Sequence, residues 1–213
     1  FVHPNQILVL LYYYLLKYKN WHGPCVRNIA TTHLLDRVAE AFGETCYEVP
    51  VGFKHISAAM QEHNAVIGGE SSGGLTVRGH INGKDGIYAA TLLVEMLSVT
   101  GKTMSQLMKE IYAEFGTAYM SEFDWPFDQE MKDQLHHLLM VEKQLPSFPI
   151  PVVATNYMDG CKVLFENGWI IARFSGTEPR LRVFCEMPTR EEAERLTAVM
   201  ADFLGLPMPV KMV

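Results

Sequence analysis

A short segment near the carboxyl end of the chain, "ARFSGTEPRLRVFCE", combines arginine, hydroxyl and glycine residues between two apolar runs. A guanidinium group can hold two phosphate oxygens at once, and hydroxyl groups and glycine amides can donate to the remaining oxygens. The spacing predicts a loop, called the phosphate loop below, that binds one phosphate group through Arg173, Ser175, Gly176, Thr177 and Arg182. The alternative interpretation is a solvated turn in which the arginines pair with neighbouring glutamates.

A second segment, residues 67–80 ("IGGESSGGLTVRGH"), is called the glycine segment below. It places a carboxylate and two hydroxyls among glycines. Glu70, Ser71 and Ser72 could contact a ligand rich in hydroxyl groups, because glycines such as Gly69 and Gly73 let the backbone approach it closely. A sugar fits that description, whereas the glycine spacing does not match the dinucleotide-binding fingerprint. The alternative interpretation is a flexible loop whose glutamate is only solvated.

Three cations outside the phosphate loop are further candidates for anion binding. Lys54 follows Gly52 in the first turn of a predicted helix, where a cation is unfavourable to the helix dipole unless an anion is held there. A plain surface lysine is the alternative. Arg78 and Lys84 could stand at the rim of the glycine segment, and Asp85 is the predicted N-cap of the next helix.

The composition excludes several classes of function. The chain has 213 residues, of which 48% are hydrophobic and 20% charged, as is typical of a globular protein. A formal net charge of −6 argues against binding along a nucleic-acid backbone. The most apolar run, residues 7–16, is about half the roughly 20 residues that a membrane-spanning helix needs. Cys25, Cys46, Cys161 and Cys185 lack metal-ligand spacing, so we expect buried thiols in a reducing, cytoplasmic environment.

The elements that must position the glycine segment alternate between helix and strand in the first half of the chain. Helical patterns cover residues 5–18, 32–42, 52–62 and 85–99, and short apolar runs, "PCVRNIA", "TCYEVP" and "AVIGG", lie between them. This alternation predicts a three-layer α/β/α domain with a mainly parallel sheet over residues 1–116. The glycine segment would then lie at the carboxyl end of that sheet, where ligands of α/β folds collect.

The phosphate loop belongs to a second predicted domain, a small α+β domain with an antiparallel sheet over residues 117–213. A helix is expected over residues 129–143. The dipeptide Asn167-Gly168 between "CKVLFE" and "WIIARF" predicts a β-hairpin, and "RLRVFCE" is a third strand. Thr189 and Glu192 form a capping-box pattern that opens a final helix. Residues 115–128 are predicted to be a flexible junction between the domains.

Three segments in series, "GGESSGG", "KDGIYAA" and "RFSGTEPRLRV", resemble the α-D-phosphohexomutase superfamily, the phosphoglucomutases and phosphomannomutases. The resemblance covers almost the whole chain, but only the third and fourth of that family's four domains, of which the fourth is TATA-binding-protein-like. The first domain of those enzymes carries a serine that is phosphorylated in the active state, and the second carries an aspartate-rich magnesium loop. The resemblance therefore implies that a chain beginning at Phe1 is a processed product or an excised fragment.

The resemblance also implies roles for individual residues. It makes Glu70 and Ser72 the ligands of the sugar hydroxyls and places Lys54 beside the reacting phosphate. Gly74 stands where some relatives have histidine, which leaves the preferred sugar open. The clamp for the phosphate that is not transferred falls to the residues of the phosphate loop: Arg173, Ser175, Gly176, Thr177 and Arg182.

The implied reaction interconverts hexose 1-phosphate and hexose 6-phosphate through a bisphosphate intermediate. The full-length protein would use Mg²⁺ and hexose 1,6-bisphosphate, and its metal ligands would lie outside this chain. The expected partners are a phosphosugar and the missing N-terminal domains, with neither nucleic acid nor membrane. Without the serine and metal loops the isolated chain should be inactive. The alternative is a phosphosugar-binding module that has no catalytic role.

Overall fold

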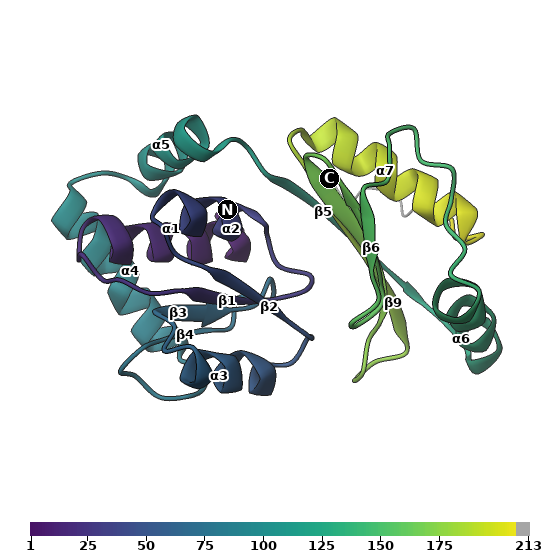
Figure 1. Cartoon of the computed structure of the whole chain (residues 1–213), viewed down its shortest axis with the longest axis horizontal. Coiled ribbons are helices and arrows are strands. Elements are labelled where there is room, and N and C mark those ends of the chain that lie inside the picture. Colours follow the sequence, from purple (N-terminus) through teal and green to yellow (C-terminus); the bar gives the residue numbers. More distant parts are fainter. Residues whose placement is uncertain (208–213) are drawn as a thin grey trace. The chain divides into compact units, whose positions relative to one another are not determined.

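The computed structural model describes residues 1–207. Their internal contacts divide them into two compact units, one covering Phe1–Thr117 and the other beginning at Ala118. Each unit has its own sheet and its own helices (Figure 1). Among the described residues, no helix is long and apolar enough to cross a membrane.

The sheet of the first unit has the strand order β2-β1-β3-β4. Strands β1 (Cys25–Asn28), β2 (Cys46–Val49) and β3 (Ile67–Gly69) are parallel, and β4 (Leu75–Val77) runs antiparallel to β3. The predicted parallel sheet is confirmed, with β4 as an addition that the sequence did not indicate. Because β1, β2 and β3 are parallel, their carboxyl ends meet at one edge of the sheet.

Helices cover both faces of this sheet, as Figure 1 shows. A Cβ atom on Gly68 would lie 2.5 Å from Met60 Sδ of α3, and one on Gly69 would lie 2.8 Å from Leu8 Cδ1 of α1. Neighbouring strand residues point to opposite faces, so α3 and α1 pack on opposite sides of β3. The helices of the unit are α1 (Pro4–Lys17), α2 (Leu34–Ala41), α3 (Phe53–Glu62), α4 (Gly86–Thr100) and α5 (Met104–Phe115).

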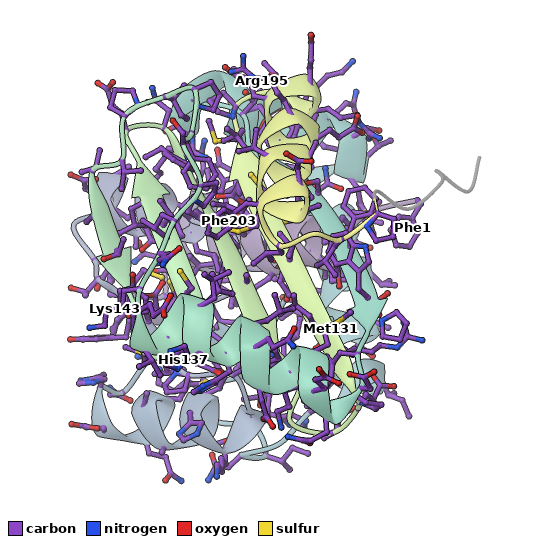
Figure 2. All side chains as sticks on the ribbon, turned by 90° about the vertical axis from the view of Figure 1, so that its right-hand side faces the viewer. Phe1, Met131, His137, Lys143, Arg195 and Phe203 are labelled. Carbon is purple, nitrogen blue, oxygen red and sulfur yellow. The ribbon has the colours of Figure 1, made fainter. Side chains whose placement is uncertain are left out.

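The second unit has an antiparallel sheet in the order β5-β9-β8-β7-β6. Its strands are β5 (Tyr119–Pro126), β6 (Ala154–Asn156), β7 (Cys161–Phe165), β8 (Gly168–Phe174) and β9 (Arg180–Met187). Its helices are α6 (Gln129–His136), which continues into the π-helical turn η1 (His137–Val141), and α7 (Arg190–Phe203). Figure 2 shows Met131 and His137 along the first of these helices and Arg195 and Phe203 along α7, both in front of the sheet.

The core of the second unit lies between this sheet and its helices. Ile170, Val183 and Cys185 from the strands pack with Leu196 and Met200 from α7, and all five are buried. The hairpin predicted at Asn167-Gly168 is confirmed, because β7 and β8 pair antiparallel across it. The predicted helix start is also confirmed, since Thr189 is the N-cap of α7 and its hydroxyl accepts from the Glu192 amide.

The predicted flexible junction over residues 115–128 is wrong for most of that range. β5 pairs with β9 along its whole length, from Tyr119 opposite Met187 to Pro126 opposite Arg180. Its alternation is hard to recognise because Ser121 occupies a position that faces the core. Ser121 is buried there because its hydroxyl bonds the Thr197 hydroxyl (2.6 Å) and the Ala193 carbonyl (3.2 Å) of α7.

The four cysteines are free thiols, and Cys25, Cys161 and Cys185 are buried. Burial raises the pKa of the Cys161 thiol to about 11 and that of Cys185 further. Both thiols therefore stay protonated near neutral pH, which fits a structural role in the core.

Candidate functional site

Glu70 lies at the carboxyl edge of the first sheet, directly after β3, and only 5% of it is exposed. Its Oε1 accepts from the Gly52 amide (3.2 Å) and from Asn28 Nδ2 (3.3 Å), and its Oε2 pairs with Lys84 Nζ (2.8 Å). A buried carboxylate needs such a cation and such donors to offset its lost hydration. The parallel strands bring Asn28, Gly52 and Glu70 together, and Lys84 reaches them from the segment between β4 and α4.

Asn28 is a site residue that the sequence analysis missed. It is the last residue of β1, and its Oδ1 accepts from the Ala30 amide (3.0 Å) and from the Thr31 hydroxyl (2.8 Å). Thr31 Oγ1 in turn accepts from the Ser71 amide (2.9 Å). These bonds tie the end of β1 to the glycine segment. The signal was available, because a buried strand that ends in asparagine places an amide at the edge of the sheet where ligands of α/β folds collect.

The glycine segment forms a tight turn between β3 and β4. The Glu70 amide donates to the Gly74 carbonyl and the Gly73 amide to the Glu70 carbonyl, each at 2.9 Å. Gly73 has a φ of +98°, which a side chain would rarely adopt. Ser72 is exposed at the tip of the turn, so its hydroxyl is presented to solvent. Gly69 instead serves packing, because Leu8 fills the space that its Cβ would need.

The three cations that the sequence placed near this turn differ in their contacts. Arg78 donates to the backbone carbonyls of His22 (3.0 Å) and Asn64 (3.1 Å), so its predicted place at the rim of the site is wrong. Lys54 is exposed in the first turn of α3, and it makes no hydrogen bond or ion pair within residues 1–207. Lys84 contacts Glu70 directly.

Asp85 is the N-cap of α4, as the sequence predicted. Its Oδ1 accepts from the amides of Ile87 and Tyr88 (3.0 Å each), and its Oδ2 pairs with His80 Nε2 (2.9 Å). The Tyr88 amide and then the His80 side chain hold the pKa of Asp85 below its ordinary value. This cap fixes the start of α4 immediately after Lys84.

The phosphate loop connects β8 to β9 in the second unit. The Ser175 amide donates to the Arg180 carbonyl (2.8 Å), and Ser175 Oγ accepts from the amides of Thr177 (3.4 Å) and Glu178 (3.3 Å). Apart from Gly176 itself and its two chain neighbours, no described residue has an atom within 4 Å of the place where a Cβ on Gly176 would stand. The loop is therefore closed at its base and open at its tip.

Arg173 is the buried cation of this loop, with 7% of the residue exposed. Its Nη2 lies 3.4 Å from Asp159 Oδ2, and its Nε is buried without a hydrogen-bond partner among the described residues. A contact of 3.4 Å is long for a charge-assisted hydrogen bond, and an unpaired buried donor is costly. The described residues therefore satisfy the Arg173 guanidinium only in part.

Arg182 stands directly opposite Arg173 on the neighbouring strand. Its Nη2 pairs with Glu178 Oε2 at 2.5 Å, with both side chains partly exposed. This is the pairing that the solvated-turn interpretation expected, but it holds for Arg182 only. Two guanidinium groups on facing positions repel each other, and a bound anion would offset that repulsion.

Metal-binding residues are not gathered in either unit. Within residues 1–207, no group of three or more His, Cys, Asp or Glu side chains is placed so that it could hold a metal ion. The residues described here do not fit a magnesium site.

Each of the two units matches a known family model. Residues 3–115 match the family model described as "Phosphoglucomutase/phosphomannomutase, alpha/beta/alpha domain III". Residues 139–203 match the one described as "Phosphoglucomutase/phosphomannomutase, C-terminal domain". The two matches lie in the same order along the chain as the glycine segment and the phosphate loop.

Individual relatives give the same result. A phosphoglucomutase/phosphomannomutase from Thermococcus kodakarensis is 32% identical over 177 residues, which cover 82% of this chain and 36% of the relative. A phosphoglucomutase from Komagataeibacter xylinus is 29% identical over 218 residues, covering 94% of this chain and 39% of the relative.

A solved structure has the same fold. The crystal structure of a phosphoglucomutase/phosphomannomutase family protein from Burkholderia thailandensis superposes with a TM-score of 0.72 at 19% identity. The superposition covers 96% of this chain and 42% of that chain. The chain thus spans about two fifths of the length of the proteins that it matches.

Proposed function

Because this chain belongs to the phosphoglucomutase/phosphomannomutase family, we propose that it is the phosphosugar-binding part of a phosphohexose mutase. The parent enzyme would interconvert hexose 1-phosphate and hexose 6-phosphate through hexose 1,6-bisphosphate. The single observation that carries the proposal is Arg173, a buried guanidinium with an unpaired Nε at the base of an open loop. A structural arginine would have its donors satisfied by the protein.

The phosphate loop is the proposed clamp for the phosphate that is not transferred. Arg173 would offer its guanidinium fork, and Gly176 leaves the tip open for the phosphate to reach backbone amides. The hydroxyls of Ser175 and Thr177 lie 3.5 Å apart and could both turn toward phosphate oxygens. Arg182 would also bind the phosphate, either by breaking its ion pair with the partly exposed Glu178 or by using the donors that this ion pair does not occupy.

The glycine segment is the proposed binding site for the sugar hydroxyls. Glu70 is a fixed acceptor, because its carboxylate is held by donors from three different segments. Ser72 adds an exposed hydroxyl next to it. Lys54, in the first turn of α3, would lie beside the reacting phosphate, where the free amides of a helix start also favour an anion. In this proposal residues 1–116 contain the sugar-binding loop and residues 117–213 contain the phosphate-binding loop.

These roles suit a reaction in which the sugar must turn around between two transfers. A clamp that recognises only a phosphate can hold either end of the bisphosphate in turn. Transfer of a phosphoryl group in line depends on positioning and charge neutralisation, and this is what the chain's own residues would supply. In this proposal the phosphorylated serine and the magnesium ligands belong to N-terminal domains of the parent, because this chain matches only domain III and the C-terminal domain of the family.

A titration of the chain with glucose 6-phosphate, free glucose and sulfate tests the proposal. We expect glucose 6-phosphate to bind more tightly than either of the other ligands, because it alone carries both the hydroxyls proposed for the glycine segment and the phosphate proposed for the loop. Glu70→Gln should weaken glucose 6-phosphate binding while leaving sulfate binding unchanged. Glu110→Gln is the matched control, because Glu110 forms an exposed ion pair with Lys102 in the same unit. Equal binding of glucose 6-phosphate and sulfate would contradict the assignment of the glycine segment.

A further inference from the structure

The second unit contains a cavity at the end of its sheet that lies away from the phosphate loop. Strands β8 and β9 pair antiparallel, so the start of β8 at Gly168 lies beside the end of β9 at Met187, and the phosphate loop joins their opposite ends. The cavity has a volume of about 310 Å³. It is called the hairpin cavity below, because residues 165–167 of the β7–β8 hairpin line it, together with residues from the segment before β6, the end of β9 and the first turn of α7.

The buried part of this lining is apolar and is fixed in place by packing. Phe165 and Met187 are 6% and 5% exposed, and the Phe165 ring packs edge-on against Phe148 with the ring centroids 5.1 Å apart. Met187 can approach the hairpin because residue 168 is glycine, where a Cβ would lie 2.5 Å from Met187 Sδ. The rest of the apolar lining consists of Ile150, Pro151, Val153 and Pro188. A mostly apolar cavity of this size is typical of sites for small organic molecules.

Two carboxylates stand among these apolar side chains. Glu166 is exposed in the hairpin turn, and its side chain makes no hydrogen bond or ion pair within residues 1–207. Glu192, in the first turn of α7, is partly buried, and in the same part of the chain its carboxylate accepts only from the Thr189 hydroxyl (2.8 Å). None of the described lining residues is a cation. Arg190 lies two positions before Glu192, and side chains two apart on a helix do not face each other.

An apolar cavity with carboxylates at its rim suits a molecule that has an apolar body and a basic group. We propose that the hairpin cavity binds a small organic amine, whose body contacts Phe165 and Met187 and whose ammonium group donates to Glu166 and Glu192. The apolar body would displace water from apolar surface, and the positive charge would offset the repulsion between the two carboxylates. The proposal is independent of the proposed function, because it uses none of the residues assigned to phosphate or sugar.

The size of the cavity favours a small molecule over a protein partner. A water molecule takes up about 30 Å³ of liquid, so 310 Å³ corresponds to roughly ten waters, or to an amine of about ten non-hydrogen atoms. A stable protein interface buries about 800 Å² on each partner. Among the lining residues and their chain neighbours, the large exposed hydrophobic side chains are Val152 and Val153, at 42% and 66% exposure. Two valines are too few to form the apolar centre of such an interface.

Titration of the whole 213-residue chain with four probe molecules tests the proposal. 2-Phenylethylamine is a cation near neutral pH. 2-Phenylethanol has the same shape without the charge, phenylacetate carries the opposite charge, and ethylamine lacks the ring. We expect 2-phenylethylamine to bind most tightly, by roughly threefold or more over each of the others. In amide NMR spectra the affected signals should be those of residues 165–168 and 187–192, and the phosphate loop should not respond.

Substitutions at the rim separate the role of charge from that of apolar contact. Glu166→Gln and Glu192→Gln should each weaken 2-phenylethylamine binding roughly threefold, the scale of a partly exposed ion pair, and leave 2-phenylethanol binding unchanged. Glutamine at position 192 preserves the helix start, because it also serves in a capping box. Val153→Ser, at an exposed position, should weaken binding of both probes. Glu130→Gln is the matched control, because Glu130 is an exposed glutamate of α6 outside the cavity.

Three results would overturn the proposal. If 2-phenylethylamine binds no better than 2-phenylethanol, the carboxylates do not select the ligand. If the double variant Glu166→Gln, Glu192→Gln binds the amine as well as Glu130→Gln does, the amine is held by other groups. If the amide signals of residues 165–168 and 187–192 do not move, the hairpin cavity is not the binding site. Any of these results would leave the proposed phosphosugar site unaffected.

Discussion

Replacing Arg173 with alanine should abolish most of the phosphate binding of this chain while leaving the fold intact. Only 8% of the Arg173 side chain is exposed, and its one ion pair within residues 1–207, to Asp159, is long at 3.4 Å. Its Nε has no partner in the described part of the chain. The substitution therefore removes few hydrogen bonds within the protein. It also removes an unpaired buried donor, whose desolvation lowers the stability of the fold.

The expected loss of affinity follows from the type of bond. A hydrogen bond that involves a charged group contributes about 1.5–3 kcal/mol, and each 1.4 kcal/mol corresponds to a factor of about ten in the dissociation constant. Arg173→Ala should thus weaken binding of both glucose 6-phosphate and sulfate by roughly ten- to a hundredfold. Arg173→Lys should recover only part of this, because lysine keeps the charge but lacks the planar fork.

Calorimetric titration at fixed ionic strength measures these affinities, and a urea denaturation curve checks that each variant is folded. Arg195→Ala is the matched control, because Arg195 is an exposed arginine of α7, labelled in Figure 2, and its removal changes the net charge equally. If folded Arg173→Ala binds both ligands within twofold of the unmodified chain, the clamp is not built on Arg173. A loss confined to glucose 6-phosphate would likewise refute the reasoning, because a phosphate clamp must also lose sulfate.

Three further outcomes are expected. Gly160→Ala should lower the free energy of unfolding by roughly 2–4 kcal/mol, because the new Cβ would lie 2.6 Å from Arg173 Cβ at a φ of +106°. Gly205→Ala, at a φ of +67° in open space, should cost only about 1–2 kcal/mol in the same urea titration, and equal losses would contradict the steric argument. The lowered pKa of Asp85 means that its contribution to stability is complete above an unfolded pKa of about 3.9 and is lost as the pH falls through the folded value. Asp85→Asn should therefore flatten the acid side of the stability profile, and an unchanged profile would argue against this cap. Finally, the purified chain should show no conversion of glucose 1-phosphate to glucose 6-phosphate in a coupled assay, and turnover that co-purifies with the chain would refute the proposed division of labour.

Local sequence signals were sufficient for much of the fold. The hairpin at Asn167-Gly168 and the cap at Thr189 depend on residues within a few positions of each other, so their patterns predicted the structure directly. The same holds for the alternation of helices and short buried strands that indicated a parallel sheet. Strand β5 was missed because its core-facing Ser121 is polar, and only the hydroxyls and carbonyls of α7 explain why it is buried.

The two candidate loops were recognisable by composition alone, because glycines, hydroxyls and charged groups are concentrated in single short segments. Their partners were not. Arg78 and Lys84 looked equivalent in the sequence, yet Arg78 bonds backbone carbonyls and Lys84 pairs with Glu70. Asn28 was not considered, although it supports the same carboxylate.

The sequence by itself thus determined most of the order of the elements, apart from β4 and β5, and the residue types of the two candidate loops, since both depend on neighbouring residues. Only the tertiary structure decided which distant groups surround each charge. Asn28 and Gly52 meet at Glu70 because the parallel strands β1, β2 and β3 end at one edge of the sheet, and Lys84 reaches Glu70 from the segment between β4 and α4. No local pattern records that meeting. Burial decided the rest: within residues 1–207 Arg173 Nε is buried without a hydrogen-bond partner, and the proposed contact with an anion depends on that.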